Sequence, residues 1–124
     1  MNPQIVSTAY GDIINGSTAY ADTLVYHVLA GGANDGTGGN GSDVWKNFSL
    51  AQGDQINIHD LLVGWNGQTS TLGNYLSVAT VGNNTVISID RDGTAGAFHS
   101  TTLVTLENVH TTLDELIQNN HIVA

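Results

Sequence analysis

The fold of this chain is decided by one stretch of nine residues, Gly38-Gly39-Asn40-Gly41-Ser42-Asp43-Val44-Trp45-Lys46. The stretch matches the repeat G-G-x-G-x-D-x-U-x, where U is a large apolar residue, which forms calcium-binding turns in parallel β-rolls. Its glycines permit the positive φ angles that point carbonyl oxygens inward. Asp43 adds a carboxylate oxygen, a ligand that calcium prefers, and Trp45 would anchor the turn to a core. The alternative is a flexible Gly/Asn loop before a strand.

A single nonapeptide supplies only half of a calcium site, because calcium in a roll lies between successive turns. The other half must come from elsewhere in the chain. Asn34 lies one nonapeptide period before Asp43, so Asn34 or the neighbouring Asp35 is a candidate, as is Asp22. Residues 31–42 are too rich in glycine for a helix or a central strand.

Two earlier segments repeat the D-x-U core of the motif without its full set of glycines. They are Asp12-Ile13-Ile14 and Asp22-Thr23-Leu24, and their aspartates are ten residues apart, near the length of one roll turn. We expect both aspartates to be candidate calcium ligands in degenerate repeats. The alternative is a simple turn between Asp12 and Gly16, followed by a strand from Thr23 to Leu29.

The remainder of the chain predicts mostly β-structure. Apolar and polar residues alternate in several short runs, which is the period of a half-buried strand. The expected strands are 44–48, 55–60, 75–81, 85–90 and 101–106. Gly82-Asn83-Asn84 is a hairpin signal between two of them, because glycine and asparagine tolerate positive φ. We therefore expect an antiparallel β-sandwich-like domain with a short calcium-binding β-roll element.

The C-terminal segment predicts a short helix. Thr112-Leu113-Asp114-Glu115 is a capping-box signature, and Leu113, Leu116 and Ile117 follow at helical spacing. Asn119-Asn120 ends the helix. Residues 121–124 form a short apolar tail that we expect to be extended.

Composition narrows the classes of partner. At 124 residues the chain is expected to form one domain, and its eleven acidic residues face only Lys46 and Arg91, giving a net charge of −9. This balance argues against nucleic acid and anionic membranes, which require basic patches, and suits a protein that neutralises carboxylates with divalent cations. The absence of cysteine is compatible with export. No apolar run is long enough for a transmembrane helix, and no secretory signal peptide is recognised at the N-terminus.

A second candidate for calcium is Asp90-Arg91-Asp92-Gly93, which offers Asp90 and Asp92 at i and i+2 beside a glycine turn. Its alternative is a solvated β-turn with Arg91 paired locally. Asp54 and Asp60 are explained more simply as a turn former and a cap. The five histidines lack zinc-ligand spacing. No nucleophile elbow or phosphate-binding loop is present, so neither a hydrolase triad nor a phosphate-binding site has support in the sequence.

Several landmarks occur in a fixed order along the chain, at residues 22–26, 38–43, 47–49, 53–56, 60–62, 74–78, 84–93, 103–106 and 111–117. The most specific are Asp90-Arg91-Asp92-Gly93 and Thr111-Thr112-Leu113-Asp114-Glu115-Leu116-Ile117. Over residues 10–124 this series resembles the C-terminal target domain of type I secreted RTX (repeats-in-toxin) adhesins. These are very long biofilm-associated surface proteins of Gram-negative bacteria.

The resemblance implies an uncleaved C-terminal secretion signal, read by a type I ABC transporter, on a non-enzymatic domain that folds outside the cell as Ca²⁺ binds. It implies a monomeric domain of a longer chain at the bacterial cell surface. The expected layout is a tail over 1–9, a degenerate RTX tract over 10–46, a β-sandwich over 44–110, and a signal helix and tail over 111–124. The implied signal residues are Thr112, Leu113, Asp114, Glu115, Leu116, Ile117, Ile122 and Val123.

Two other functions stay open. The first is a calcium-dependent module that binds glycans or surface partners, for which Trp45, Trp65 and Tyr75 are the residues able to stack on sugars. Core packing is the competing explanation for at least two of these aromatic residues. The second is a β-sandwich hydrolase, for which no catalytic constellation is visible.

Overall fold

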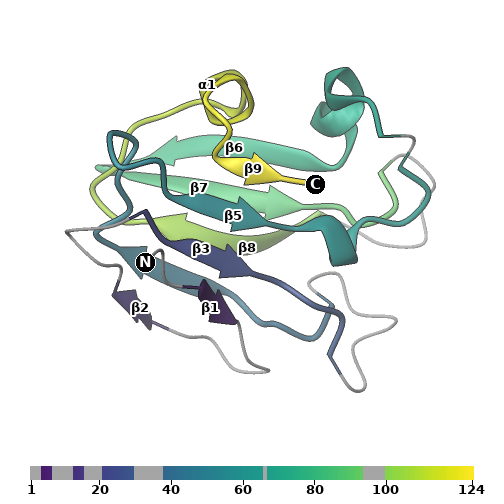
Figure 1. The fold of residues 1–124 in the computed structure, drawn as a ribbon, viewed down its shortest axis with the longest axis horizontal. Coiled ribbons are helices and arrows are strands. Elements are labelled where there is room, and N and C mark those ends of the chain that lie inside the picture. The colour runs from purple at the N-terminus through teal and green to yellow at the C-terminus, as the bar shows by residue number, and fades with distance from the viewer. Residues whose placement is uncertain (1–3, 7–12, 16–20, 30–37, 66, 94–99) are drawn as a thin grey trace.

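The computed structural model describes residues 4–6, 13–15, 21–29, 38–65, 67–93 and 100–124. Its fold is mainly β, with two sheets and one short α-helix (Figure 1). Sheet A has the strand order β1-β3-β5-β9. Its strands are β1 (Gln4–Val6), β3 (Thr23–Val25), β5 (Gln55–Asn57) and β9 (Ile122–Val123).

Sheet B has the strand order β2-β4-β8-β7-β6. Its strands are β2 (Ile13–Asn15), β4 (Asp43–Lys46), β6 (Leu76–Val81), β7 (Asn84–Ile89) and β8 (Thr101–Leu106). The helical elements are the 3-10 turns η1 (His59–Leu61) and η2 (Thr69–Asn74), and the helix α1 (Leu113–Gln118). No helix among the described residues has the length and apolar character to cross a membrane.

The first five strands alternate between the two sheets, and each of the first three pairs with the strand two places further along. β1 pairs with β3, β2 with β4 and β3 with β5, always in parallel. β4 with β8 and β5 with β9 are also parallel pairs. The predicted antiparallel arrangement is therefore wrong for β5 and for the pairing of β4 with β8. The alternation of apolar and polar residues is the same in parallel and antiparallel strands, so the sequence pattern does not encode the direction of pairing.

Antiparallel pairing is confined to β6, β7 and β8. β6 and β7 form the predicted hairpin, in which Gly82 and Asn83 connect the paired residues Val81 and Asn84. Gly82 has a φ of 60°, in the left-handed region that glycine reaches without strain. The hairpin prediction is confirmed, and the observed strands begin within one residue of those expected.

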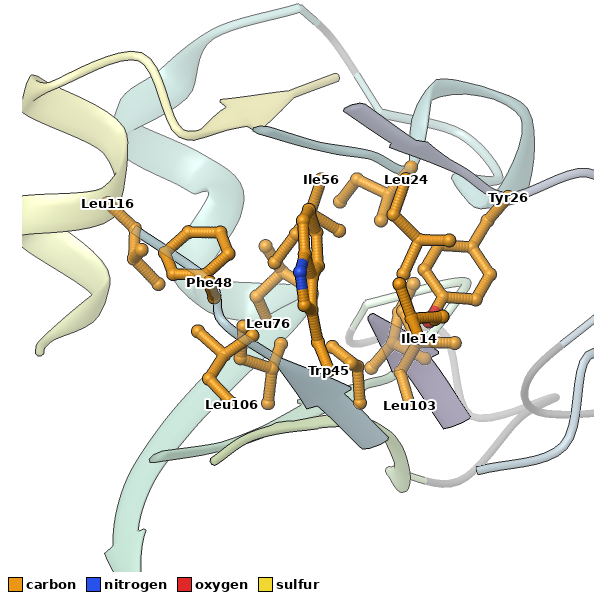
Figure 2. Packing of buried hydrophobic residues seen from close by; sticks show 14 of the residues in the cluster. Ile14, Leu24, Tyr26, Trp45, Phe48, Ile56, Leu76, Leu103, Leu106 and Leu116 are labelled. Atoms are coloured by element: carbon orange, nitrogen blue, oxygen red, sulfur yellow. The ribbon is translucent and has the colours of Figure 1, made fainter. Parts of the chain in front are cut away.

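A single hydrophobic cluster contains buried residues from both sheets (Figure 2). Leu24 and Ile56 come from sheet A, and Trp45 and Leu106 come from sheet B; all four are fully buried. The Trp45 ring contacts Phe48 edge-on, with 4.9 Å between ring centroids. The burial of these large apolar side chains between the two sheets is the main force that holds the sheets together.

The C-terminal segment is part of the same structure. The Thr112 side chain accepts a hydrogen bond from the Glu115 backbone N–H at 3.2 Å, so the predicted N-cap of α1 is confirmed. The helix ends at Asn119, and Asn120 adopts a left-handed φ of 59°. The chain then enters β9, which lies beside β5, so the expected extended tail is confirmed as a strand of sheet A.

Candidate functional site

The turn before β4 has the backbone conformation that its glycines predict. Gly38, Gly39 and Gly41 have φ angles of 68°, 86° and 71°. Gly38 is buried and its carbonyl accepts a hydrogen bond from the Leu29 N–H at 2.8 Å. A side-chain Cβ at this position would lie 2.6 Å from Leu61 Cδ2. Glycine is required here both for the backbone angle and for the space, so the turn is a packed structural element.

Asp43 is fully buried at the start of β4. Alternate residues of a strand share a face, so Asp43 points to the same side as the core residue Trp45. The Tyr26 hydroxyl donates a hydrogen bond to Asp43 Oδ2 at 2.9 Å. A buried carboxylate is costly unless donors or a cation compensate it, and Tyr26 supplies one donor.

Asn40 ties the glycine turn to the segment that follows β3. Its side chain is fully buried, and Nδ2 donates to the His27 carbonyl at 2.8 Å. His27 Nδ1 in turn lies 2.5 Å from Asp60 Oδ2 at the start of η1, and both side chains are about half exposed. These contacts bring together three segments that are far apart in the sequence.

Asp22 lies beside Asp54 in sheet A. The Asp22 N–H donates to Asp54 Oδ1 at 2.8 Å, and the Gln55 N–H donates to the Asp22 carbonyl at 2.7 Å. Asp54 Oδ2 also accepts from the Ser49 N–H at 2.7 Å. Both aspartates are buried, and each directly precedes a strand.

The Asp54-Gln55-Ile56 segment is therefore a further copy of the D-x-U repeat, whereas the sequence interpretation favoured a turn former at Asp54 over a calcium ligand. In the β3–β5 register Thr23 pairs with Gln55 and Leu24 with Ile56. The D-x-U pattern itself could have revealed this copy in the sequence. The segment fits that pattern, although the glycines that the full motif has two, four and five residues before the aspartate are missing. The buried apolar residue at the U position is common to all the described copies.

The predicted calcium ligands are only partly brought together. Asp22 contacts Asp54 in sheet A, whereas Asp43 begins a strand of sheet B. Asp12, Asn34 and Asp35 lie outside the described residues. Within the described ranges, no three His, Asp or Glu side chains are grouped so that they could hold a metal ion.

The Asp90–Gly93 turn packs against the body of the domain. Arg91 and Asp92 are buried, with 4% and 7% of their surface exposed. Arg91 Nε donates to the Leu61 carbonyl at 3.0 Å, and the Arg91 carbonyl accepts from the Val63 N–H at 2.8 Å. The alternative of a solvated turn is wrong, because Arg91 and Asp92 are buried and Arg91 also bonds a carbonyl 30 residues earlier in the chain.

The expected signal residues form an amphipathic unit. Leu116 is fully buried, Leu113, Ile117, Ile122 and Val123 are half-buried, and Thr112, Asp114 and Glu115 are exposed. Next to them, His121 is buried: its Nδ1 lies 2.6 Å from the Asp54 carbonyl, and its ring centroid lies 5.7 Å from that of Phe48. This histidine links α1, β9 and the β5 turn, and sequence inspection gave it no role.

The three aromatic residues considered for sugar stacking differ in their surroundings. Trp45 is fully buried in the core. Tyr75 is half-buried, and its ring packs over Gly93, where a Cβ would lie 3.0 Å from the ring. Trp65 is half-buried and borders a hollow on the surface. Trp65 and Tyr75 thus each border a recess, of about 490 Å³ and about 270 Å³ respectively.

Comparisons with protein-family models, with curated proteins and with solved structures find no match to this chain. The sequence repeat and the contacts described above are therefore the basis for assigning its function.

Proposed function

We propose that this chain is the C-terminal secretion-target domain of a large bacterial surface adhesin. It leaves the cell through a type I ABC transporter and folds outside as calcium binds. The observation that carries the proposal is the in-register stacking of the D-x-U segments. Leu24 pairs with Ile56 in sheet A, and Ile14 pairs with Trp45 in sheet B, each as a buried U residue. A parallel coil with the repeated apolar residue inside is the architecture for which the nonapeptide pattern is known.

Calcium fits the chemistry of the turn before β4. Calcium takes carboxylate and carbonyl oxygens in flexible geometry, and three glycines with left-handed φ angles precede the buried Asp43 in this turn. We assign Asp43 as the first ligand, with Asn34 or Asp35 as ligands from the preceding loop. Asp22, Asp12, Asp90 and Asp92 are the further candidates. When bound, the ion supplies positive charge to a chain that carries a net charge of −9.

Calcium binding then acts as the switch between the transported and the folded chain. In a calcium-poor cytosol the carboxylates repel and the glycine-rich turn keeps its conformational entropy. Outside, an ion that binds only the folded state stabilises it by about 2.7 kcal/mol at one hundred times its dissociation constant. This free energy is a large part of the total stability of a small domain.

The C-terminal residues 111–124 would serve as the signal read by the transporter. Their apolar residues, including Leu116, enter the core when the domain folds, whereas Asp114 and Glu115 stay at the surface. In this proposal the transporter recognises the segment while the chain is unfolded, and the segment packs against the core once the domain folds. The domain has no catalytic role and functions as one monomeric part of a longer surface protein.

An export assay tests the signal. The chain is fused behind a cytosolic passenger in a Gram-negative host that carries a type I exporter, and passenger in the medium is measured. Export should require residues 111–124. Ile87→Ala is the matched control, because Ile87 is a core residue with 1% of its surface exposed and lies outside residues 111–124; it should weaken the fold and leave export intact. Export of the truncated fusion at the level of the intact one would refute the assignment.

A second measurement tests calcium. Circular dichroism and thermal melting are recorded in EDTA and in millimolar calcium, with magnesium as the control ion. We expect calcium to raise the melting temperature, and Asp43→Asn to reduce that rise. A chain that is fully folded in EDTA, with the same melting temperature after calcium is added, would eliminate the calcium-dependent part of the proposal.

A further inference from the structure

A hollow of about 490 Å³ lies where sheet A meets the C-terminal helix and the loop after η1. Figure 1 shows β9 running toward the side of the molecule that carries η2. The lining residues are Gln55, Trp65, Leu72, Ile117, Asn120, Ile122, Val123 and Ala124. The volume is within the range of about 300–1,000 Å³ that small-ligand sites occupy.

The lining side chains carry no charge. The chain has eleven acidic residues, yet none of them, and neither Lys46 nor Arg91, is among the described residues that border this hollow. Among the described lining side chains, a cationic ligand would find no side-chain carboxylate to pair with, and an anionic one would find no basic group while facing a protein of net charge −9. The composition of the walls therefore selects a neutral ligand.

Trp65 is held in a fixed orientation at this hollow. Its indole Nε1–H donates to Thr71 Oγ1 at 3.0 Å and to the Gln68 carbonyl at 3.2 Å. The Thr71 hydroxyl donates to the same carbonyl at 2.7 Å. Because the indole N–H already donates to groups of the protein, a ligand can contact Trp65 only through the apolar face of its ring. A ring fixed in advance loses little side-chain entropy on binding.

Polar groups accompany this aromatic face. Gln55 Nε2 donates to the Asn120 carbonyl at 2.8 Å, which fixes the corner between α1 and β9. The exposed Asn120 side chain carries an amide donor and acceptor. The carbonyls of His121 and Val123 accept from β5. Neighbouring residues of a strand point their backbone groups in opposite directions, so the Ile122 N–H and carbonyl point away from β5.

We propose that this hollow binds a neutral saccharide, with a sugar ring stacked on Trp65 and hydroxyls bonded to the Asn120 amide and the Ile122 backbone. A sugar has the matching chemistry, since one ring presents C–H faces to an aromatic plane and hydroxyls at its rim. A wholly apolar ligand would leave the amide and backbone groups unpaired, at a cost of about 1–3 kcal/mol for each buried group. The proposal is independent of calcium and of secretion.

Nuclear magnetic resonance of the ¹⁵N-labelled chain tests it, because the two tryptophans give two indole N–H signals. The probes are maltose, cellobiose, lactose and N,N′-diacetylchitobiose, each added to about 10 mM, which nearly saturates a site of millimolar affinity. We expect at least one of them to shift the Trp65 signal in a saturable manner. The signal of Trp45, which is fully buried in the core, should stay in place and serves as the internal reference.

Variants locate the site. Trp65→Ala, followed through the backbone amide signals of Asn120 and Ile122 at the hollow, should weaken binding at least about tenfold, the loss expected when an aromatic contact of about 1.4 kcal/mol is removed. Val81→Ala, at an exposed position in the β6–β7 turn region, should bind like the unmodified chain. If Trp65→Ala unfolds, Trp65→Phe replaces it and should show weaker binding with an intact fold. Digalacturonate, an acidic disaccharide, should give no shift.

Three results would overturn the proposal. One is the absence of any saturable shift with all four neutral sugars. Another is an equal response of the Trp45 and Trp65 signals, which would mark a general solvent effect. The third is unchanged affinity in a folded Trp65 variant, which would place the sugar elsewhere on the protein.

Discussion

Replacing Tyr26 with phenylalanine removes one hydroxyl from the core and leaves the ring in place. That hydroxyl donates to Asp43 Oδ2 at 2.9 Å, and both residues are fully buried. A hydrogen bond to a charged group contributes about 1.5–3 kcal/mol to stability. The unfolding entropy of a 124-residue chain is about 0.26 kcal/mol/K. Tyr26→Phe should therefore lower the melting temperature by about 6–12 °C.

The assay is thermal and urea unfolding at one fixed calcium concentration, because a ligand that binds the folded state would shift both variants. Tyr75→Phe is the matched control: that residue is only half-buried, and its side chain packs over Gly93. We expect it to change the free energy of unfolding by less than about 0.5 kcal/mol. A double-mutant cycle with Asp43→Asn should give a coupling energy above about 1 kcal/mol between the two side chains. If Tyr26→Phe costs no more than Tyr75→Phe, Asp43 does not depend on this hydroxyl and the reasoning fails.

The other predictions concern the glycine turn and the C-terminal helix. Gly64→Ala should cost about 1–2 kcal/mol, because φ is 74° and the space around the position is open. Gly38→Ala should cost at least about 1 kcal/mol more, because its Cβ would also lie 2.6 Å from a buried Leu61 methyl; equal costs in urea unfolding would contradict the packing of the turn. Thr112→Ala should lower the free energy of unfolding by about 1 kcal/mol, because it removes the N-cap hydrogen bond of α1. The shift of the denaturation midpoint measures this loss. Leu116→Ala should lose about 2–5 kcal/mol from the core, and a loss below 1 kcal/mol would show that α1 is not packed as described.

Local features of the fold could be predicted from the sequence. The β6–β7 hairpin follows from Gly82 and Asn83, since few other residues adopt its turn conformation. The start of α1 follows from Thr112, whose side chain satisfies a backbone N–H that the helix leaves unpaired. Strands and the buried U positions follow from alternation.

The long-range features could not be predicted in this way. Which strands pair, and in which direction, depends on contacts between residues far apart in the sequence, such as Ile13 with Val44 and Thr23 with Gln55, and no local pattern records them. The burial of Arg91 is an example, since its partner is the carbonyl of Leu61. The same limit applies to Asp54, whose relation to Asp22 becomes visible only when β3 and β5 lie side by side.

The position of β9 gives the assembly of the domain a fixed order in time. The contact between His121 and the Asp54 carbonyl joins residues 67 apart in the sequence, and β9 completes the edge of sheet A next to β5. Closing so long a loop is entropically slow and comes before any gain from the contacts it makes. Until residues 121–123 dock, β5 therefore lacks a partner strand on one side, and we expect this pairing to form late when the domain folds.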